Sequence, residues 1–187
     1  MWTAGGSMRA TPGRRNVLEF RRGLSPVTFS PRAVDRITNR TTPVQSWYLD
    51  LGLIGDYVGT ARKYHHTAPT GMIVGLHAGL GVVLDEGLPT VWARHREVGE
   101  ALQRALPELG FSLIAPGASR LPQLTSVRLP EGLDEAVLRR RLLADYSIEV
   151  GGGLGAFAGV AWRIGLMGHT ARHRSVSALL GALREIL

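Results

Sequence analysis

Two hydroxyl and two imidazole side chains adjoin one another in Tyr64-His65-His66-Thr67. Tyrosine and threonine hydroxyls both donate hydrogen bonds, so this pattern suits an anion site such as one for phosphate. It does not suit a metal site, because adjacent histidines on a strand point to opposite faces and neither a cysteine nor a well-spaced carboxylate joins them. The structural alternative is a polar loop whose side chains are satisfied by backbone groups.

Arg163 interrupts an otherwise apolar stretch, residues 160–164, that reads as a strand. Arginines are seldom buried without a partner. Two interpretations stay open on spacing alone. Arg163 could form an internal ion pair with Glu149 or Asp145, or its guanidinium could receive a substrate carboxylate through two parallel hydrogen bonds.

Other candidates have simpler explanations. The glycine run at residues 151–155 is a tight turn or a place where backbone approaches a ligand, and no helix follows it as a dinucleotide motif requires. His95 falls on the apolar face of an expected helix and is interpreted as a satisfied core histidine. His169 and His173 flank the start of the last expected helix and are interpreted as solvated.

The composition excludes several classes of protein. The net charge of +7 comes almost entirely from scattered arginines, Lys63 being the only lysine, and no nucleic-acid-binding motif occurs. The chain contains no cysteine, which rules out disulfides and thiolate metal sites. No apolar run reaches the roughly 18 residues of a membrane span, and no secretory signal is evident. We expect a cytoplasmic protein that binds neither nucleic acid nor membrane.

The pattern of apolar residues predicts an α+β fold. From Phe111 onward the order of elements is β, β, α, β, β, α, which favours a small sheet with helices on one face. Residues 1–22 lack a sustained apolar period and are predicted to be disordered. Helices are expected at residues 30–39, 46–57, 69–86, 90–106, 134–145 and 171–186, and strands at 111–115, 124–129, 148–150 and 160–164.

Short motifs between Gly23 and Leu187 share their order and spacing with a known family. Together they resemble the middle and C-terminal parts of a class V pyridoxal-phosphate (PLP) aminotransferase of the alanine–glyoxylate and serine–glyoxylate type. The motifs are Gly23-Leu24-Ser25-Pro26-Val27-Thr28-Phe29-Ser30, Trp47-Tyr48-Leu49-Asp50, Tyr64-His65-His66-Thr67-Ala68-Pro69, His95-Arg96-Glu97, Leu121-Pro122, Ile148-Glu149-Val150, Gly152-Gly153-Leu154-Gly155 and Trp162-Arg163-Ile164-Gly165-Leu166-Met167-Gly168.

This resemblance implies a fold type I homodimer that moves an amino group from alanine or serine to glyoxylate. It implies that Tyr64 and Thr67 bind the PLP phosphate across the dimer and that Arg163 clamps the substrate carboxylate. The glycine loop with Gly153 would line the entrance. Residues 90–187 would form the family's small domain, a mostly antiparallel sheet covered by helices. Residues 23–89 would be a remnant of the large-domain and interdomain segment.

The sequence departs from the family at the cofactor lysine. Asn16 stands where the resemblance places the lysine that forms the Schiff base, and Arg21-Arg22 stand where prolines are expected. The family gives Lys63 no such role, and the large domain is expected upstream. We therefore expect a truncated chain that is inactive alone, with exposed helices at 69–86 and 90–106. The alternative is a non-catalytic dimerisation or anion-binding module derived from the small domain.

Overall fold

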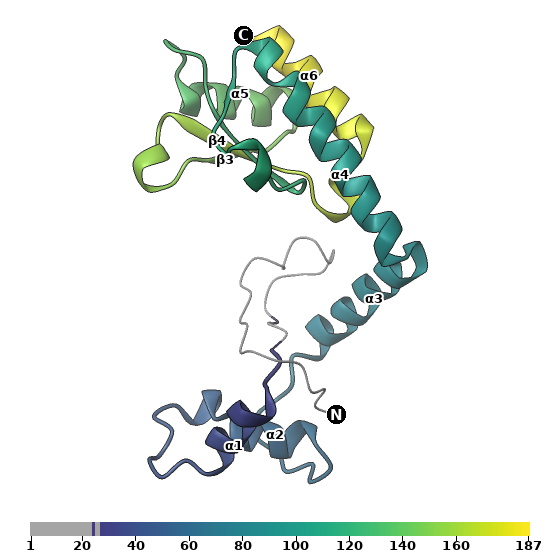
Figure 1. Ribbon diagram of the computed structural model, residues 1–187, viewed down its shortest axis with the longest axis vertical. Helices are drawn as coiled ribbons and strands as arrows, with labels where there is room; N and C mark the ends of the chain where they lie inside the picture. The colour runs from purple at the N-terminus through teal and green to yellow at the C-terminus, as the bar shows by residue number, and fades with distance from the viewer. Residues whose placement is uncertain (1–23, 25–26) are drawn as a thin grey trace. The chain divides into compact units, whose positions relative to one another are not determined.

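The computed structural model describes residue 24 and residues 27–187, so the expected tail at residues 1–22, including Asn16, lies outside the described part. The described residues form two compact units, one ending at His77 and the other running from Ala78 to Leu187. The expected division between residues 89 and 90 stays a prediction. The chain and its elements are drawn in Figure 1.

Two short helices in the first unit begin at side-chain caps. Helix α1 (Pro31–Thr38) starts after Ser30, whose hydroxyl accepts a hydrogen bond from the Ala33 amide at 3.3 Å. A proline at the first helical position supports this start. The expected helix at residues 46–57 is instead divided into a 3-10 turn, η2 (Trp47–Leu49), and helix α2 (Leu51–Val58).

Asp50 causes that division. Its backbone is extended, and its carboxylate accepts hydrogen bonds from the amides of Gly52 at 2.9 Å and Leu53 at 3.2 Å. An aspartate in this arrangement is a helix N-cap, so the chain must begin a new helix there. The periodicity of the apolar residues does not show this interruption.

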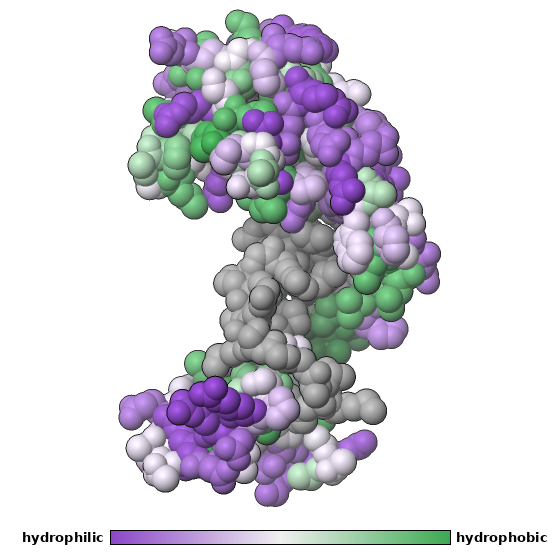
Figure 2. Space-filling model, in the orientation of Figure 1, coloured by the Kyte–Doolittle hydropathy of each residue, from purple (hydrophilic) through white to green (hydrophobic). Residues whose placement is uncertain are grey.

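Helix α3 (Thr70–Glu86) agrees with expectation, and its surface is strongly apolar. Figure 2 shows hydrophobic side chains gathered along it. A helix that is apolar on several sides is typical of one covered by other parts of a larger assembly. Its large exposed apolar residues are Met72, Ile73, Val74, Leu80, Val82 and Leu84.

Helix α4 (Leu88–Ala105) follows α3 after Gly87, whose φ of 82° ends α3. The two helices are bent by 85° at this break. No single described helix is long and apolar enough to cross a membrane, although the bent pair passes that test by length and composition. The expectation that α4 is exposed holds for only part of its surface, because the helix buries Val91, His95, Val98, Gly99 and Leu102.

The second unit contains a four-stranded antiparallel sheet in the order β1-β2-β4-β3. This sheet, with its helices, confirms the expected α+β fold. The strands are β1 (Ser112–Leu113), β2 (Leu124–Arg128), β3 (Gly151–Gly152) and β4 (Ala161–Gly165). Short 3-10 turns occur at Pro107–Leu109, Gly117–Ser119, Gly155–Phe157 and Gly168–Thr170.

The strand expected at residues 148–150 is displaced to β3, inside the glycine run that was expected to be a loop. The Ile148 amide donates to the Leu142 carbonyl at 3.0 Å and so helps to close helix α5 (Glu135–Tyr146). Its backbone is therefore committed to the helix end. Pairing with β4 begins only at Gly151, which lies opposite Arg163.

One face of the sheet carries the core. Helices α4, α5 and α6 (His173–Ile186) contribute buried side chains that join Val127 and Trp162 in one cluster. The fully buried indole of Trp162 donates to the Glu135 carboxylate at 3.2 Å, and Arg139 donates to the same oxygen at 2.8 Å. A buried polar group is costly unless it is hydrogen-bonded, so this contact lets the largest core side chain be buried.

Two helical glycines predict stability changes of opposite sign. A Cβ at Gly99 would lie 2.3 Å from the Pro122 carbonyl oxygen, whereas one at Gly181 would meet nothing within 4 Å. We expect Gly99→Ala to lower the free energy of unfolding by about 1–3 kcal/mol through overpacking. Gly181→Ala should raise it by about 0.5–1 kcal/mol because alanine favours helix. Urea denaturation followed by circular dichroism measures both, and equal stability of the two variants would contradict the packing of α4 described above.

Candidate cofactor and substrate sites

The loop between α2 and α3 brings the hydroxyls of Tyr64 and Thr67 together. Their oxygens lie 3.1 Å apart, and Tyr64 is 75% exposed. Here one hydroxyl donates to the other, and an arriving anion could accept the hydrogens of both. The arrangement therefore provides two convergent donors that are open to a ligand.

The two histidines of this loop are held by internal contacts. His65 is buried, and its Nε2 lies 2.9 Å from the Trp47 carbonyl oxygen. A carbonyl only accepts, so this nitrogen carries a hydrogen. His65 Nδ1 lies 2.7 Å from His66 Nδ1, and the Trp47 ring packs on His65 with centroids 4.2 Å apart. The two histidines thus fit the interpretation of a polar loop satisfied by internal contacts. The flanking hydroxyls of Tyr64 and Thr67 remain open to a ligand.

The ring of Tyr57, from α2, packs beside the same loop. Its centroid lies 6.2 Å from that of Tyr64 and 5.6 Å from that of His66. These contacts lie at the separations that aromatic pairs favour. The loop is thus supported from η2 through Trp47 and from α2 through Tyr57.

Lys63, the only lysine of the chain, precedes this loop. Its Nζ lies 3.1 Å from Asp56 Oδ2, and both side chains are substantially exposed. An exposed ion pair of this kind is weak and does not lock the amine in place. The structure gives Lys63 a surface contact and no hydrogen bond to Tyr64 or Thr67 within the described residues.

Arg163 lies on the face of the sheet that the helices leave open. Its Nε donates to the Gly152 carbonyl at 2.8 Å, and the side chain is exposed. Of the two interpretations left open, the internal ion pair with Glu149 or Asp145 does not occur in the part of the chain that the structure describes, where Asp145 pairs with Arg141 at 3.7 Å. With Nε engaged by backbone, the two terminal nitrogens can still receive a carboxylate.

The glycines of β3 leave room for this guanidinium. A Cβ at Gly151 would lie 3.3 Å from Arg163 Nη2, which is tighter than an ordinary contact. Across the other neighbouring strand, Ser126 lies opposite Arg163. Sequence analysis did not single out Ser126, because its place beside Arg163 depends on the strand register.

Gly153 is required by the turn that follows β3. A Cβ at this position would lie 1.9 Å from the Phe157 carbonyl oxygen, and the Gly153 amide donates to Ala161 at 2.7 Å. Close backbone approach therefore explains this glycine. Its role in lining a substrate entrance stays a prediction.

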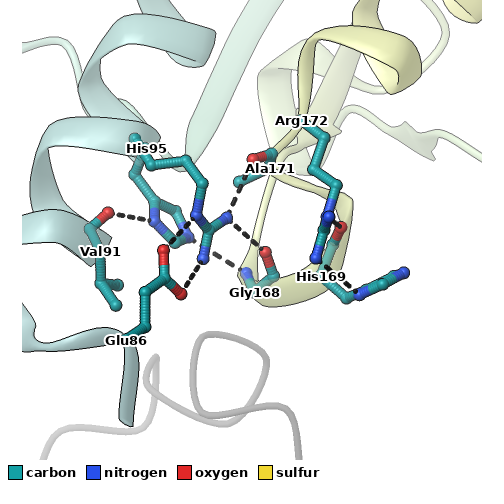
Figure 3. Close-up of polar contacts among 8 residues, drawn as sticks. Glu86, Val91, His95, Gly168, His169, Ala171 and Arg172 are labelled. Carbon is teal, nitrogen blue, oxygen red and sulfur yellow. Dashed lines mark hydrogen bonds and ion pairs between the residues drawn. The ribbon is translucent and has the colours of Figure 1, made fainter. Parts of the chain in front are cut away.

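His95 is a satisfied core histidine, as expected. It is buried, its Nδ1 donates to the Val91 carbonyl at 2.7 Å, and its Nε2 accepts from the Gly168 amide at 3.1 Å. Figure 3 shows these contacts. His169 and His173 are exposed, as expected, and each contacts a charged side chain on the surface.

A polar cluster centred on Arg94 was not predicted from the sequence. Its guanidinium binds both oxygens of Glu86, at 2.6 and 2.7 Å, and the carbonyls of Gly168 and Ala171, each at 2.9 Å. Hydrogen bonding from Arg94 lowers the pKa of Glu86 below its ordinary value of 4.5. The available signal was an acidic and a basic residue on either side of Gly87.

No protein-family model matches the chain. Individual proteins do match it. The chain is 33% identical over 196 residues to (S)-ureidoglycine–glyoxylate transaminase of Bacillus subtilis (strain 168), covering 95% of this chain and 47% of that protein. It is 37% identical over 169 residues to alanine–glyoxylate aminotransferase of Drosophila melanogaster, covering 88% and 43%.

A solved structure extends this likeness to the fold. The alanine–glyoxylate aminotransferase of Nostoc sp. is 44% identical, with a TM-score of 0.88, over 92% of this chain and 46% of that one. The chain thus spans about half the length of the relatives it matches. Identity of this extent, shared with the fold, shows that the chain belongs to the class V aminotransferases of the alanine–glyoxylate type and corresponds to their C-terminal portion.

Proposed function

We propose that this chain supplies two binding functions of a PLP-dependent aminotransferase that transfers an amino group from alanine or serine to glyoxylate. Tyr64 and Thr67 would hold the cofactor phosphate, and Arg163 would hold the substrate carboxylate. The observation that carries the proposal is the pair of hydroxyls 3.1 Å apart on an exposed loop. Relatives named for alanine–glyoxylate and ureidoglycine–glyoxylate transamination support the reaction class.

The residues present fit one end of PLP. Two hydroxyl donors at one point on the surface suit phosphate oxygens, because hydrogen bonds to a charged acceptor are strong. The aldehyde end requires an amine, and the resemblance places Asn16 at the position of the Schiff-base lysine and gives the only lysine, Lys63, no such role. When bound, PLP supplies the electron sink for transamination. We therefore propose that the chain alone is inactive.

The chemistry of this chain's own residues is binding and orientation. Tyr64 and Thr67 would donate to the phosphate and so fix one end of the cofactor. The terminal nitrogens of Arg163 would fix the plane of the substrate carboxylate, since the guanidinium is already oriented by the Gly152 carbonyl.

We further propose that the active protein is a cytoplasmic homodimer that binds neither nucleic acid nor membrane. The family resemblance supports the dimer, because it implies that the phosphate-binding hydroxyls serve the partner's site. The 75% exposure of Tyr64 leaves its side chain accessible to another chain. Equilibrium sedimentation of the purified chain measures its association.

Loss of either hydroxyl should weaken phosphate-ester binding. The probe is 4′-deoxypyridoxine 5′-phosphate, which has no aldehyde, titrated calorimetrically into the full chain. We expect Tyr64→Phe and Thr67→Val each to weaken binding by about tenfold or more, the value of a hydrogen bond to a charged group. Tyr57→Phe is the control, because the Tyr57 ring packs on the same loop. Equal affinity in all four proteins would contradict the proposed phosphate site.

Activity can be tested in a chimera in which residues 23–187 of this chain replace the corresponding portion of the Nostoc enzyme, so that the Nostoc enzyme supplies everything upstream, including the Schiff-base lysine that the resemblance implies. We expect alanine–glyoxylate turnover by the chimera and none by the chain alone. Arg163→Lys should raise the KM for alanine by about tenfold or more, because lysine offers a point charge in place of a fork. Arg128→Lys is the control, since Arg128 lies in β2 of the same sheet and its guanidinium packs on Phe157 at 5.5 Å. A folded chimera without turnover would contradict the proposed function.

A further inference from the structure

The break between α3 and α4 consists of Gly87, whose amide donates to the Val83 carbonyl at 3.0 Å and whose carbonyl accepts from the Val91 amide at 3.0 Å. Glu86 is the last residue of α3, Gly87 follows at a φ of 82°, and α4 starts at Leu88. A Cβ at Gly87 would meet only the Thr90 hydroxyl, at 4.0 Å. The backbone bonds of Gly87 close the two helix ends, but glycine has no side chain that fixes the angle between the helices. A side-chain contact across the 85° bend therefore adds a restraint that the linker itself lacks.

Arg94 makes that contact. Its Nε and Nη2 donate to the two carboxylate oxygens of Glu86 across the bend. The pairing uses the fork geometry in which arginine binds carboxylates best. About a quarter of each side chain is exposed, 24% for Arg94 and 27% for Glu86, so solvent screens this pair less than a fully exposed one.

The remaining terminal nitrogen of Arg94, Nη1, binds the turn after β4. It donates to the carbonyls of Gly168 and Ala171, while the Gly168 amide donates to His95. Arg94 and His95, which are consecutive in α4, therefore bind the carbonyl and the amide of Gly168. Figure 3 labels His95 and Gly168 in this cluster. Gly168 has a φ of 55°, so this turn takes a conformation that favours glycine.

We propose that Arg94 is a positioning residue that joins the end of α3, helix α4 and the turn after β4 into one rigid body. Strand β4 ends at Gly165, three residues before Gly168, and carries Arg163. Through this contact, β4 keeps its orientation relative to the end of α3. The consequence for substrate binding by Arg163 rests on the proposed function, whereas the rigidity of the bend does not.

Charge at Glu86 supports the bend. Hydrogen bonding from Arg94 lowers the Glu86 pKa most, and the charges of Arg94 and Arg172 act in the same direction against desolvation. Because the folded pKa lies below 4.5, the stabilisation is present above that pH and is lost as the pH falls through the folded pKa. The bend should thus stay fixed above pH 4.5 and loosen as the pH falls through the lowered folded pKa of Glu86.

Spin-label distances test the bend directly. The chain has no cysteine, so Val82→Cys in α3 and Arg96→Cys in α4 give two unique label sites, both exposed. We expect one narrow distance distribution at pH 7, and a distribution at least about twice as wide in Glu86→Gln and in Arg94→Gln. Lowering the pH stepwise from 7 through the folded pKa of Glu86 should widen the original distribution and leave that of Glu86→Gln unchanged.

Hydrogen exchange separates the two sets of contacts. Arg94→Gln should raise amide exchange at Gly168 by about tenfold or more, because it removes the donors to the turn. Glu86→Gln should leave that exchange nearly unchanged, because the donors to Gly168 and Ala171 remain. Arg104→Gln is the matched control, since its exposed pair with Glu100 at 3.6 Å lies within α4 alone.

Unchanged distances and unchanged exchange in folded Arg94→Gln, verified by circular dichroism, would overturn the inference. A widened distribution that Arg104→Gln reproduces would also overturn it. These measurements use the chain without cofactor or substrate. An inactive chimera would therefore contradict the proposed function and leave the inference about Arg94 unaffected.

Discussion

The antiparallel pairing of β2 with β4 is the constraint on which the second unit depends. Five residue pairs lie in register from Leu124 with Gly165 to Arg128 with Ala161. Because side chains alternate along a strand, this register sends Trp162 into the core and Arg163 to the opposite face. A shift of one residue would exchange the two, burying a guanidinium and exposing the largest core side chain.

Each candidate binding group is fixed by few contacts. The Gly152 carbonyl orients the guanidinium of Arg163, and the Trp47 carbonyl fixes His65, which supports the loop beside the two hydroxyls. Preorganised groups lose less entropy when a ligand binds. Among the residues that the structure describes, the hydroxyls of Tyr64 and Thr67 hydrogen-bond to each other, so an anion can replace that bond at small cost. A binding site requires a rigid backbone that presents a few hydrogen-bond donors to the ligand.

Much of the fold could be predicted because local signals and packing agree. Ser30 followed by a proline marked the start of α1, and apolar periodicity located the long helices. The β, β, α, β, β, α order was correct for the same reason. The errors arose where hydrogen bonds to backbone groups determine where a helix or strand begins or ends. Asp50 caps a new helix and so divides an expected one. The Ile148 amide bonds to the end of α5, so the strand expected at residues 148–150 begins instead at Gly151.

The sites were predictable in part. Tyr64 and Thr67 are close in sequence, so a single loop is enough to bring their hydroxyls together. The environment of Arg163 depended on strand register, and an ion pair remained open until the structure placed Asp145 with Arg141. Arg94 and Gly168 lie 74 residues apart, and no periodicity or short motif reports a contact between a side chain and a distant carbonyl.

The central claim is that this chain holds the phosphate of PLP without holding its aldehyde. The most direct test is to add PLP to the purified full chain, reduce with borohydride and measure adduct formation by mass spectrometry and absorbance. The account predicts weak binding that inorganic phosphate displaces, and no covalent adduct. An adduct on Lys63, lost in Lys63→Arg, or on the N-terminal amine would show that the chain holds the aldehyde and would contradict the claim.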